Sequence, residues 1–465
     1  MLVSSRGTHY LDGAAAGDAG RSSMTSIFIA SLHYAPEETG IAPYSTGVAE
    51  HLAAQGYSVT VLAGLPHYPE RCVADEYRGD GRRAQRTEVR NGVVVRRSRH
   101  HVPRTQSALR RGLYEATSLS MAAEGWRLPK PDAVIGVVPS LSGGITARAL
   151  AARFGVPYGL LFQDLASQAC AESGIAGGRR VAGVVRAAER WAAGRAAAVG
   201  IIAEGFRPYV ESLGVDATRI RRVRNWTHTS PAATGRETMR ARLGWDEAQT
   251  VCLHAGNMGA LQNVIDAAVL ASAANQPVLF VLMGDGNQRQ ALEAVAARYR
   301  LRNLRFLPLQ AAVDYGSVLA AADILLVNQR ASVDDLSLPS KLTSYFAAGR
   351  PVVAAAAAHS ETAREVSWSS GGIVVAPEDP KALLAGILRV ANDGALAAYL
   401  GRSGAAWAAS VLSPQQALRS YEQLVAAVLA SGTHGRVHSV GRVVGAAAEA
   451  GSGEDPDFEQ DRRAA

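Results

Sequence analysis

Two glycine-containing turns follow apolar strand patterns in the second half of the chain. The first, Gly-Asn-Met-Gly at residues 256–259, comes directly after the apolar run 251–255, and the second, Gly-Asp-Gly at 284–286, follows the run 278–283. Short turns of this kind at strand ends expose backbone N–H groups, which bind phosphate oxygens. We therefore predict a diphosphate site that includes four residues: Gly256, Asn257, Gly259 and Gly284.

A lysine at the start of a predicted helix adds a positive charge to this site. Ser340 is a good N-cap residue, and Lys341 and Leu342 follow it in the first helical turn. The helix dipole disfavours a cation at this end, so Lys341 is best explained if it faces an anion. Lysine binds phosphate as a point charge. We assign all three residues to the diphosphate site, and an ordinary surface lysine is the alternative interpretation.

Two residues of the first half also follow strand patterns. Gly40 lies in the turn 33–41, where its backbone N–H could approach a phosphate, although it could equally be a plain turn glycine. Asp164 follows the apolar run 158–162, at the strand end where α/β sheets place ligands. A carboxylate there can act as a base or bind a sugar hydroxyl, so Asp164 is the candidate catalytic residue. An N-cap role is its alternative.

The elements that would position these residues form an α/β fold, because apolar runs alternate with helical patterns throughout. The predicted strands are 26–30, 58–62, 92–96, 133–137, 158–162, 200–203, 251–255, 278–283, 304–307, 324–327, 352–355 and 372–375. The predicted helices are 44–55, 104–124, 144–154, 178–193, 264–274, 288–299, 313–321, 341–348, 380–391, 402–409 and 414–429.

The 465 residues, 48% of them hydrophobic, are enough for two or three globular domains. We expect an N-terminal Rossmann-like acceptor domain at 24–203, a linker at 204–225 where the apolar rhythm breaks, and a C-terminal Rossmann-like donor domain at 226–400. Helices at 401–430 can pack back on the first domain. Residues 1–23 and 431–465 lack a core pattern and are expected to be disordered, with Met24 an alternative start.

The three cysteines are far apart and show no metal-binding or redox spacing, which favours a reduced, cytoplasmic setting. No uninterrupted apolar run approaches the roughly 20 residues that span a bilayer. The first 23 residues also lack the apolar segment of a signal peptide.

A block of positive charge occupies residues 82–111, with ten arginines and the single acid Glu88. Such a block could meet nucleic acid, an anionic membrane or an acidic substrate. Few aromatic residues are interleaved, so base stacking and a nucleic-acid partner are not indicated. The amphipathic pattern of 104–127 favours a membrane surface, with an ordinary solvated face as the alternative. We assign three residues to membrane or acceptor binding: Arg104, Arg110 and Arg111.

Taken together, these segments resemble the retaining glycosyltransferases of family 4, which have the GT-B architecture, and especially the colanic-acid and capsule-type sugar transferases. The resemblance covers residues 26–429. Its most specific pieces are 34–41, 66–69 (Pro-His-Tyr-Pro), 136–140, 163–164 (Gln-Asp), 224–226 (Arg-Asn-Trp), 256–259 and 339–342 (Pro-Ser-Lys-Leu).

This resemblance implies two Rossmann-like domains facing across a cleft that binds a UDP- or GDP-sugar. It implies transfer of a hexose with retention and without a metal or other cofactor, so helix N-termini and basic side chains must meet the charge of the leaving diphosphate. Gly40 would close the site from the other domain. We expect a lipid-linked or saccharide acceptor of exopolysaccharide or cell-envelope glycan synthesis. The basic block 82–111 would then meet anionic headgroups or a polyprenyl diphosphate at the inner face of the plasma membrane.

The chain departs from the family pattern near the predicted site. The loop at 260–264 lacks the lysine that relatives carry there, and the E-x7-E element is missing, with Ser344 where its second glutamate, a ribose contact, would stand. Residues 166–168 replace the usual Trp-Pro-Glu-Ser run after Asp164. These differences support one alternative, a catalytically inactive nucleotide-sugar-binding or scaffold protein. An epimerase of the same architecture is another, whereas the spacing of the glycine turns disfavours a Rossmann oxidoreductase.

Overall fold

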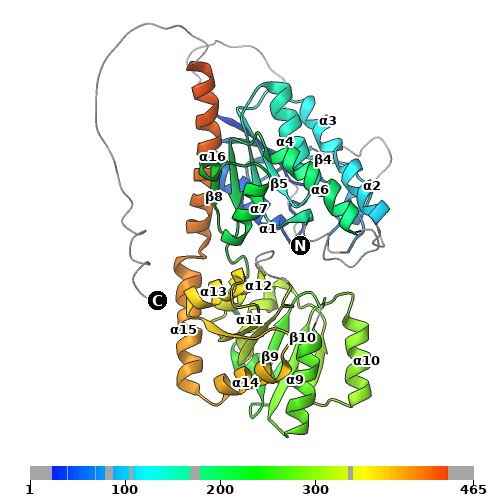
Figure 1. The fold of residues 1–465 in the computed structure, drawn as a ribbon, viewed down its shortest axis with the longest axis vertical. Coiled ribbons are helices and arrows are strands. Elements are labelled where there is room, and N and C mark those ends of the chain that lie inside the picture. Colours follow the sequence, from blue (N-terminus) through cyan, green and yellow to red (C-terminus); the bar gives the residue numbers. More distant parts are fainter. Residues whose placement is uncertain are drawn as a thin grey trace, which may run out of the picture.

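The computed structural model describes residues 24–38, 40–68, 70–78, 87–103, 108–167, 178–259, 261–332 and 339–437. These residues form two α/β domains, which lie one above the other in Figure 1. The predicted class, two α/β domains with parallel sheets, is confirmed. The predicted leader at 1–23 and the predicted tail beyond residue 437 lie outside the described residues.

The first sheet has eight strands in the order β3-β4-β2-β1-β5-β6-β7-β8, all parallel except β3, which is antiparallel to β4. Its strands are β1 Ser26–Ala30, β2 Ser58–Gly64, β3 Thr87–Arg90, β4 Val93–Ser98, β5 Ala133–Val138, β6 Tyr158–Phe162, β7 Ala198–Ile201 and β8 Ile220–Arg222. Strands β5 and β6 are buried along their whole length, which explains their continuous apolar sequences.

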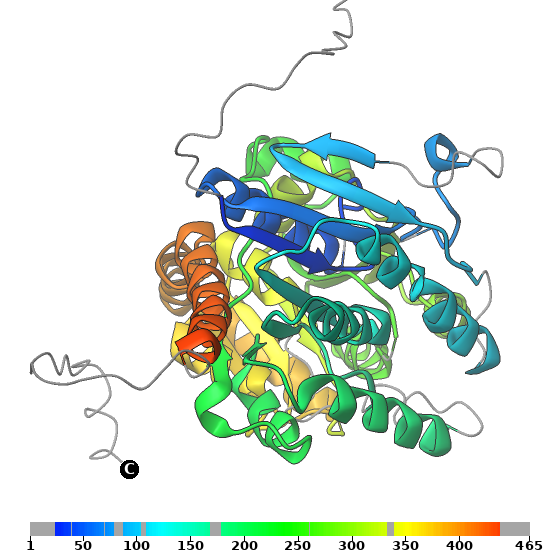
Figure 2. The ribbon, with the colours of Figure 1, turned by 90° about the horizontal axis from the view of Figure 1, so that it is seen from above.

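Helices on both faces cover this sheet, as Figure 2 shows from above. They are α1 Ala42–Ala54, α2 Ala108–Ser118, α3 Ser120–Trp126, α4 Leu141–Phe154, α6 Gly178–Ala193, α7 Arg207–Ser212 and α16 Pro414–Val437. The last helix of the chain therefore returns to the first domain. It packs beside α1 over β5, β6 and β7, where Tyr421, Leu424 and Val428 join the first core.

The second sheet has six parallel strands in the order β11-β10-β9-β12-β13-β14. They are β9 Thr250–Ala255, β10 Val278–Met283, β11 Leu304–Leu307, β12 Ile324–Asn328, β13 Val352–Ala355 and β14 Gly372–Val375. Its helices are α8 Arg236–Leu243, α9 Gln262–Ala273, α10 Arg289–Tyr299, α11 Ala312–Ala321, α12 Lys341–Ala347, α13 Glu361–Ser369, α14 Pro380–Ala391 and α15 Gly394–Ser410. Alternate residues of β9 face two separate cores, Leu253 with α12 and Cys252 with α9.

Several predicted boundaries differ from the structure. Residues 204–225, which the sequence predicts to be a linker, contain α7 and the edge strand β8, which pairs with β7. This strand was missed because two of its three residues are arginines and give no apolar pattern. The predicted helix 104–124 is two helices, α2 and α3, with their break at Leu119. Helix α16 continues to residue 437, into the predicted tail.

Two further helices and one further strand were also missed. Like α7, the helices α8 and α13 are short or rich in polar residues, and β3 is a four-residue polar edge strand. Helix α15 begins at Gly394 rather than near residue 402, with Asp393 as a side-chain cap for Leu396. Among the described residues, no helix on its own has the length and hydropathy of a membrane span. The consecutive helices α14 and α15, with a bend of 96° between them, together have a length and composition that a broken span would need.

Buried carboxylates join the two domains. Glu365 on α13 accepts hydrogen bonds from Arg224 at 3.1 Å, just beyond β8, and from the indole N–H of Trp407 on α15 at 2.8 Å. Glu361 accepts from the backbone N–H of Gly205 at 2.8 Å. Because a buried carboxylate is costly without donors, these contacts hold the second domain in one position against the first.

We expect the change Glu365→Ala to lower the free energy of unfolding by about 3 kcal/mol, because it leaves Arg224 and the Trp407 indole without their acceptor. The midpoint of thermal unfolding measures the effect. The control is Glu293→Ala, which removes a surface pair with Arg289 and should cost under about 1 kcal/mol. Equal shifts for the two variants would contradict the role of Glu365.

Candidate functional site

The two predicted glycine turns pack against each other at the carboxyl edge of the second sheet. Gly256 directly follows β9 and has a φ of +127°, and Gly284 directly follows β10 and has a φ of +133°. The Gly256 N–H donates to the carbonyl of Met283 at 2.8 Å. A Cβ at Gly284 would lie 2.1 Å from the Gly256 carbonyl oxygen, so the close approach of these turns requires glycine.

Lys341 is brought to the same place from a distant part of the sequence. It begins α12, and its Nζ lies 3.5 Å from where a Cβ of Gly256 would be. Burial lowers the pKa of Lys341 to about 8. No carboxylate pairs with it among the residues that the structure describes. The site therefore combines a partly desolvated ammonium group with a turn that exposes backbone.

His254 holds the ammonium group and was missed by the sequence analysis. The Lys341 Nζ donates to its Nε2 at 3.2 Å. The imidazole is buried inside β9, and burial together with the Lys341 charge lowers its pKa well below the ordinary value. The ring is therefore neutral and does not cancel the positive charge. The one available signal was a histidine inside the apolar run 251–255.

Tyr345 fixes the end of β9 beside this pair. Its hydroxyl accepts from the backbone N–H of Ala255 at 2.8 Å and donates to the carbonyl of the same residue at 3.3 Å. The phenol is fully buried on α12, one turn after Lys341. Helix α12 therefore positions both the cation and the strand end that faces it.

Three other predicted donor-site residues, Asn257, Ser340 and Ser344, lie near Lys341 but differ in their contacts. Asn257 lies in the turn, with its carbonyl 3.4 Å from His254 Nε2, and its amide nitrogen is 3.5 Å from where a Cβ of Gly259 would be. Ser340 occupies the N-cap position of α12, but its exposed hydroxyl makes no capping hydrogen bond. The hydroxyls of Ser344 and Thr229 lie 2.7 Å apart, which ties α12 to the segment that follows β8.

Leu342 does not fit the predicted role. Its side chain is buried in the second core, and its N–H donates to the carbonyl of Pro339 at 3.0 Å. A side chain that faces the core of its domain cannot also contact a ligand at the strand ends. The residue therefore anchors α12, and its neighbour Lys341 provides the charge.

The first domain approaches this site through α1. The Tyr44 ring packs edge-on against His228 at 5.3 Å, and its hydroxyl lies close to Thr343 on α12. Gly40 precedes α1 with a φ of +67° and is exposed. The turn that contains Gly40 therefore leads into a helix that contacts α12.

Asp164 follows β6 at the carboxyl edge of the first sheet. Its Oδ1 accepts from the Leu165 N–H at 2.8 Å, and burial raises its pKa. The preceding residue, Gln163, forms a closed set of hydrogen bonds with Asn225 and Tyr421: Asn225 Nδ2 donates to Gln163 Oε1 at 2.7 Å, and the Tyr421 hydroxyl donates to Asn225 Oδ1 at 2.7 Å. This set joins β6, the interdomain segment and α16, and so fixes the position of Asp164.

The predicted membrane-binding arginines lie on or near α2. Arg110 and Arg111 are exposed, and Arg111 pairs with Glu115 at 2.8 Å, whereas Arg104 lies outside the described residues. Two leucines of the same helix are also exposed, Leu109 by 84% and Leu113 by 47%. Helix α2 therefore presents a surface that is both basic and apolar.

The sequence matches known families in both halves. Residues 39–226 match the family described as a glycosyl transferase 4-like domain, and residues 249–393 match the glycosyl transferases of group 1. The chain is 33% identical over 380 residues to WcaI, a colanic acid biosynthesis glycosyl transferase of Escherichia coli (strain K12). That match covers 78% of this chain and 91% of WcaI.

Solved structures share the fold at low sequence identity. Sucrose-phosphate synthase from Thermosynechococcus elongatus superposes with a TM-score of 0.67 at 18% identity, over 88% of this chain and 100% of that one. HepE from Anabaena, in complex with UDP-glucose, gives a TM-score of 0.60 at 16% identity, over 86% and 99%. WaaG, a glycosyltransferase involved in lipopolysaccharide biosynthesis, gives 0.60 at 18% identity, over 84% and 98%.

We expect Gly284→Ala to lower the free energy of unfolding by about 1–3 kcal/mol, because the new Cβ meets the Gly256 carbonyl and the backbone is in a glycine conformation. Thermal unfolding measures the loss. Gly183→Ala is the matched control: Gly183 is exposed on α6 with no atom within 4 Å of an added Cβ, so this change should stabilise by about 0.5–1 kcal/mol. A neutral Gly284→Ala variant would rule out the close approach of the two turns.

Proposed function

The chain belongs to the glycosyltransferases of polysaccharide biosynthesis, with a 4-like domain and a group 1 domain on a GT-B fold, and from that premise we propose its reaction. The protein transfers a hexose, with retention at the anomeric carbon, from a UDP- or GDP-sugar. The acceptor is a saccharide or a lipid-linked sugar, in the synthesis of an exopolysaccharide or cell-envelope glycan.

The observation that carries this proposal is the ammonium group of Lys341 beside the Gly256 turn. When the glycosidic bond to the diphosphate breaks, negative charge develops on the leaving oxygen. A cation that is already partly desolvated stabilises this charge more strongly than one in water, and it needs no reorganisation. The backbone N–H groups of Asn257 and Gly259 would bind the remaining phosphate oxygens, since those of Gly256 and Met258 already donate to carbonyls. In this arrangement, the leaving group is stabilised without a divalent metal.

Two further observations support a nucleotide donor and an acceptor on the first domain. HepE, which shares the fold, is known in complex with UDP and with UDP-glucose. Asp164 lies at the carboxyl edge of the first sheet, and α1 of the same domain contacts α12. We propose that the Asp164 carboxylate binds a sugar hydroxyl and orients it for transfer.

A second candidate function is nucleotide-sugar binding without transfer. The chain lacks the family's lysine in the loop after Gly259, and Ser344, which stands in place of a glutamate, is engaged with Thr229. A protein of this kind would bind a nucleotide sugar but release no nucleoside diphosphate with any acceptor. Product formation from a panel of nucleotide sugars and lipid-linked acceptors distinguishes the two functions.

We also propose that the protein lies at the inner face of the plasma membrane. The exposed side chains of Leu109 and Leu113, next to Arg110 and Arg111, suit the boundary between anionic headgroups and acyl chains. This surface belongs to the first domain, where the acceptor is expected. A polyprenyl-linked acceptor could then reach the site from the membrane.

We expect Lys341→Met to weaken UDP binding by about ten- to a hundredfold, because it removes a charge-assisted contact to phosphate. Isothermal titration calorimetry measures the dissociation constant. The matched control is Lys381→Met, since Lys381 also lies in the first turn of a helix, α14, but is exposed. Unchanged UDP affinity in Lys341→Met would show that the diphosphate binds elsewhere.

The same contact makes a pH prediction. The pKa of Lys341 in the free protein is about 8, so the site loses its positive charge as the pH rises through that value. We expect the UDP affinity of the unmodified protein to fall above pH 8, by up to about tenfold per unit. The Lys341→Met variant should show no such fall. A pH-independent affinity between 7 and about 9.5 would contradict a role for the ammonium group.

We expect binding to anionic vesicles that weakens as salt is raised, because attraction of arginines to headgroups is screened. Sedimentation with phosphatidylglycerol vesicles measures it. Changing both Leu109 and Leu113 to serine should reduce binding about tenfold or more through the loss of apolar burial, with the exposed Tyr399 on α15, changed to serine, as the control. Equal binding to neutral and anionic vesicles at all salt concentrations would exclude this membrane surface.

A further inference from the structure

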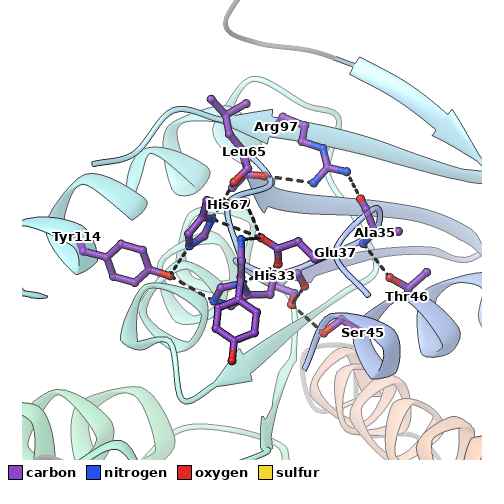
Figure 3. Close-up of polar contacts among 12 residues, drawn as sticks. His33, Ala35, Glu37, Ser45, Thr46, Leu65, His67, Arg97 and Tyr114 are labelled. Atoms are coloured by element: carbon purple, nitrogen blue, oxygen red, sulfur yellow. Dashed lines mark hydrogen bonds and ion pairs between the residues drawn. The ribbon is translucent and has the colours of Figure 1, made fainter. Parts of the chain in front are cut away.

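A cluster of imidazole and phenol groups lies in the first domain, beyond the carboxyl ends of β1 and β2 (Figure 3). His33 follows β1, His67 follows β2 and Tyr114 lies on α2. The Tyr114 oxygen is 3.2 Å from the Nε2 of His67 and also 3.2 Å from the Nε2 of His33. Three groups that can ligate a metal thus converge from three separate segments.

The Nδ1 atom of each imidazole, on the side of the ring away from Tyr114, faces a hydrogen-bond acceptor. The Nδ1 of His33 lies 2.7 Å from Glu37 Oε2, and the Nδ1 of His67 lies 2.9 Å from the carbonyl of Leu65. A carbonyl or carboxylate oxygen accepts only, so each Nδ1 carries a proton. The Nε2 of each ring is then the atom left to bind a cation, and both Nε2 atoms face the Tyr114 oxygen.

Both carboxylate oxygens of Glu37 already accept hydrogen bonds that orient the histidines. Its Oε1 accepts from the backbone N–H groups of His67 at 2.8 Å and Tyr68 at 3.0 Å, while Oε2 faces His33. One ligand atom from each of Glu37, His33 and His67 lies within 4.8 Å of the others, but the donors already bound to Glu37 leave it as an orienting group. Metal-binding histidines typically donate their second ring N–H to just such a carboxylate or carbonyl.

The Tyr114 oxygen lies at the same distance from the Nε2 atoms of His33 and His67. A cation bound beside these three atoms would be ligated by all of them at once. Ligand atoms about 2.0–2.1 Å from a tetrahedral Zn²⁺ are about 3.3 Å from one another, close to the separations found here.

A third imidazole lies next to the cluster. The ring of His100 is centred 4.7 Å from that of His67 and 5.5 Å from that of Tyr114. Both of its ring nitrogens are buried. Among the described residues, the group whose ligand atoms lie within 4.8 Å of one another contains His33, Glu37 and His67 but not His100, so the His100 ring packs against the cluster without joining it.

We propose that His33, His67 and Tyr114 bind a divalent transition-metal ion, with Glu37 and the Leu65 carbonyl as orienting groups and with solvent in the remaining position. Nitrogen-rich ligand sets of this kind favour Zn²⁺ over Mg²⁺ or Ca²⁺. Binding breaks the O–H bond of Tyr114 and forms a metal–phenolate bond, and the proton leaves to solvent. The ion would join the segments after β1 and β2 to α2.

We assign this site a structural role that is distinct from the binding of the diphosphate. Its ligands belong to the first domain, whereas Lys341 and the Gly256 turn belong to the second. The ion would fix α2, which carries the exposed leucines and arginines, against the sheet. The metal-free protein should therefore still bind UDP, so a failure of the metal site and a failure of the donor site give different results.

The test is titration of the metal-free, full-length protein with Co²⁺, whose visible absorption reports tetrahedral coordination. We expect one Co²⁺ per chain, displacement of Co²⁺ by Zn²⁺, and a higher unfolding midpoint with Zn²⁺ bound. Tyr114→Phe keeps the ring but removes the ligand oxygen, and it should weaken Zn²⁺ binding at least tenfold. Tyr68→Phe is the control, because Tyr68 packs edge-on against His33 but gives no ligand.

Two results would overturn the proposal. One is the absence of stoichiometric Co²⁺ or Zn²⁺ binding by the folded protein, which would mean that the cluster is held by its hydrogen bonds alone. The other is unchanged metal affinity in both Tyr114→Phe and His67→Gln, which would place the ion elsewhere. Circular dichroism of each metal-free variant verifies that it is folded, so a lost site is not confused with a lost domain.

Discussion

A partly desolvated ammonium group that faces neutral partners is the constraint on which the donor site depends. Lys341 loses hydration when α12 packs, and burial lowers its pKa, while its hydrogen-bond partner His254 stays uncharged. This costs folding free energy that a carboxylate partner would have offset. The cost is recovered when an anion binds, because the ammonium then regains a counter-charge. The glycine turns are shaped around the same point, since any side chain at Gly284 would separate them.

The fold places the donor-site residues of the second domain and Asp164 of the first domain at comparable edges of their two sheets. Parallel strands place all their carboxyl ends at one edge, so Asp164 and Gly256 each lie at the carboxyl edge of its own sheet. Glu365 then fixes the domains against each other through Arg224, and α16 returns to the first core. The motif 224–226 thus has a structural role: its first two residues supply the pair with Glu365 and the amide that joins Gln163 to Tyr421.

The first domain contains a second group of polar side chains whose burial costs folding free energy unless they are hydrogen-bonded. Glu37, His33 and His67 are held in a hydrogen-bonded set around Tyr114, and this set connects two strand ends to α2. Such a set is stabilising only when every member has a partner. Its position matters because α2 carries the basic and apolar surface that we assign to the membrane, so the order of the cluster and the orientation of that surface depend on each other.

The sequence by itself determined the buried strands, such as 278–283 and 352–355, because an apolar run between turn residues reports burial locally. It also determined the glycine turns, the position of Lys341 at a helix start and the family resemblance. The sequence analysis missed β8, because two arginines interrupt the apolar pattern of that strand. It also assigned Leu342 to the ligand site, whereas the side chain lies in the core. Only the tertiary structure paired Lys341 with His254, 87 residues apart, and brought His33 and His67 to Tyr114. Periodicity describes which face of an element is buried, whereas contacts between distant residues are set by how sheets and helices pack.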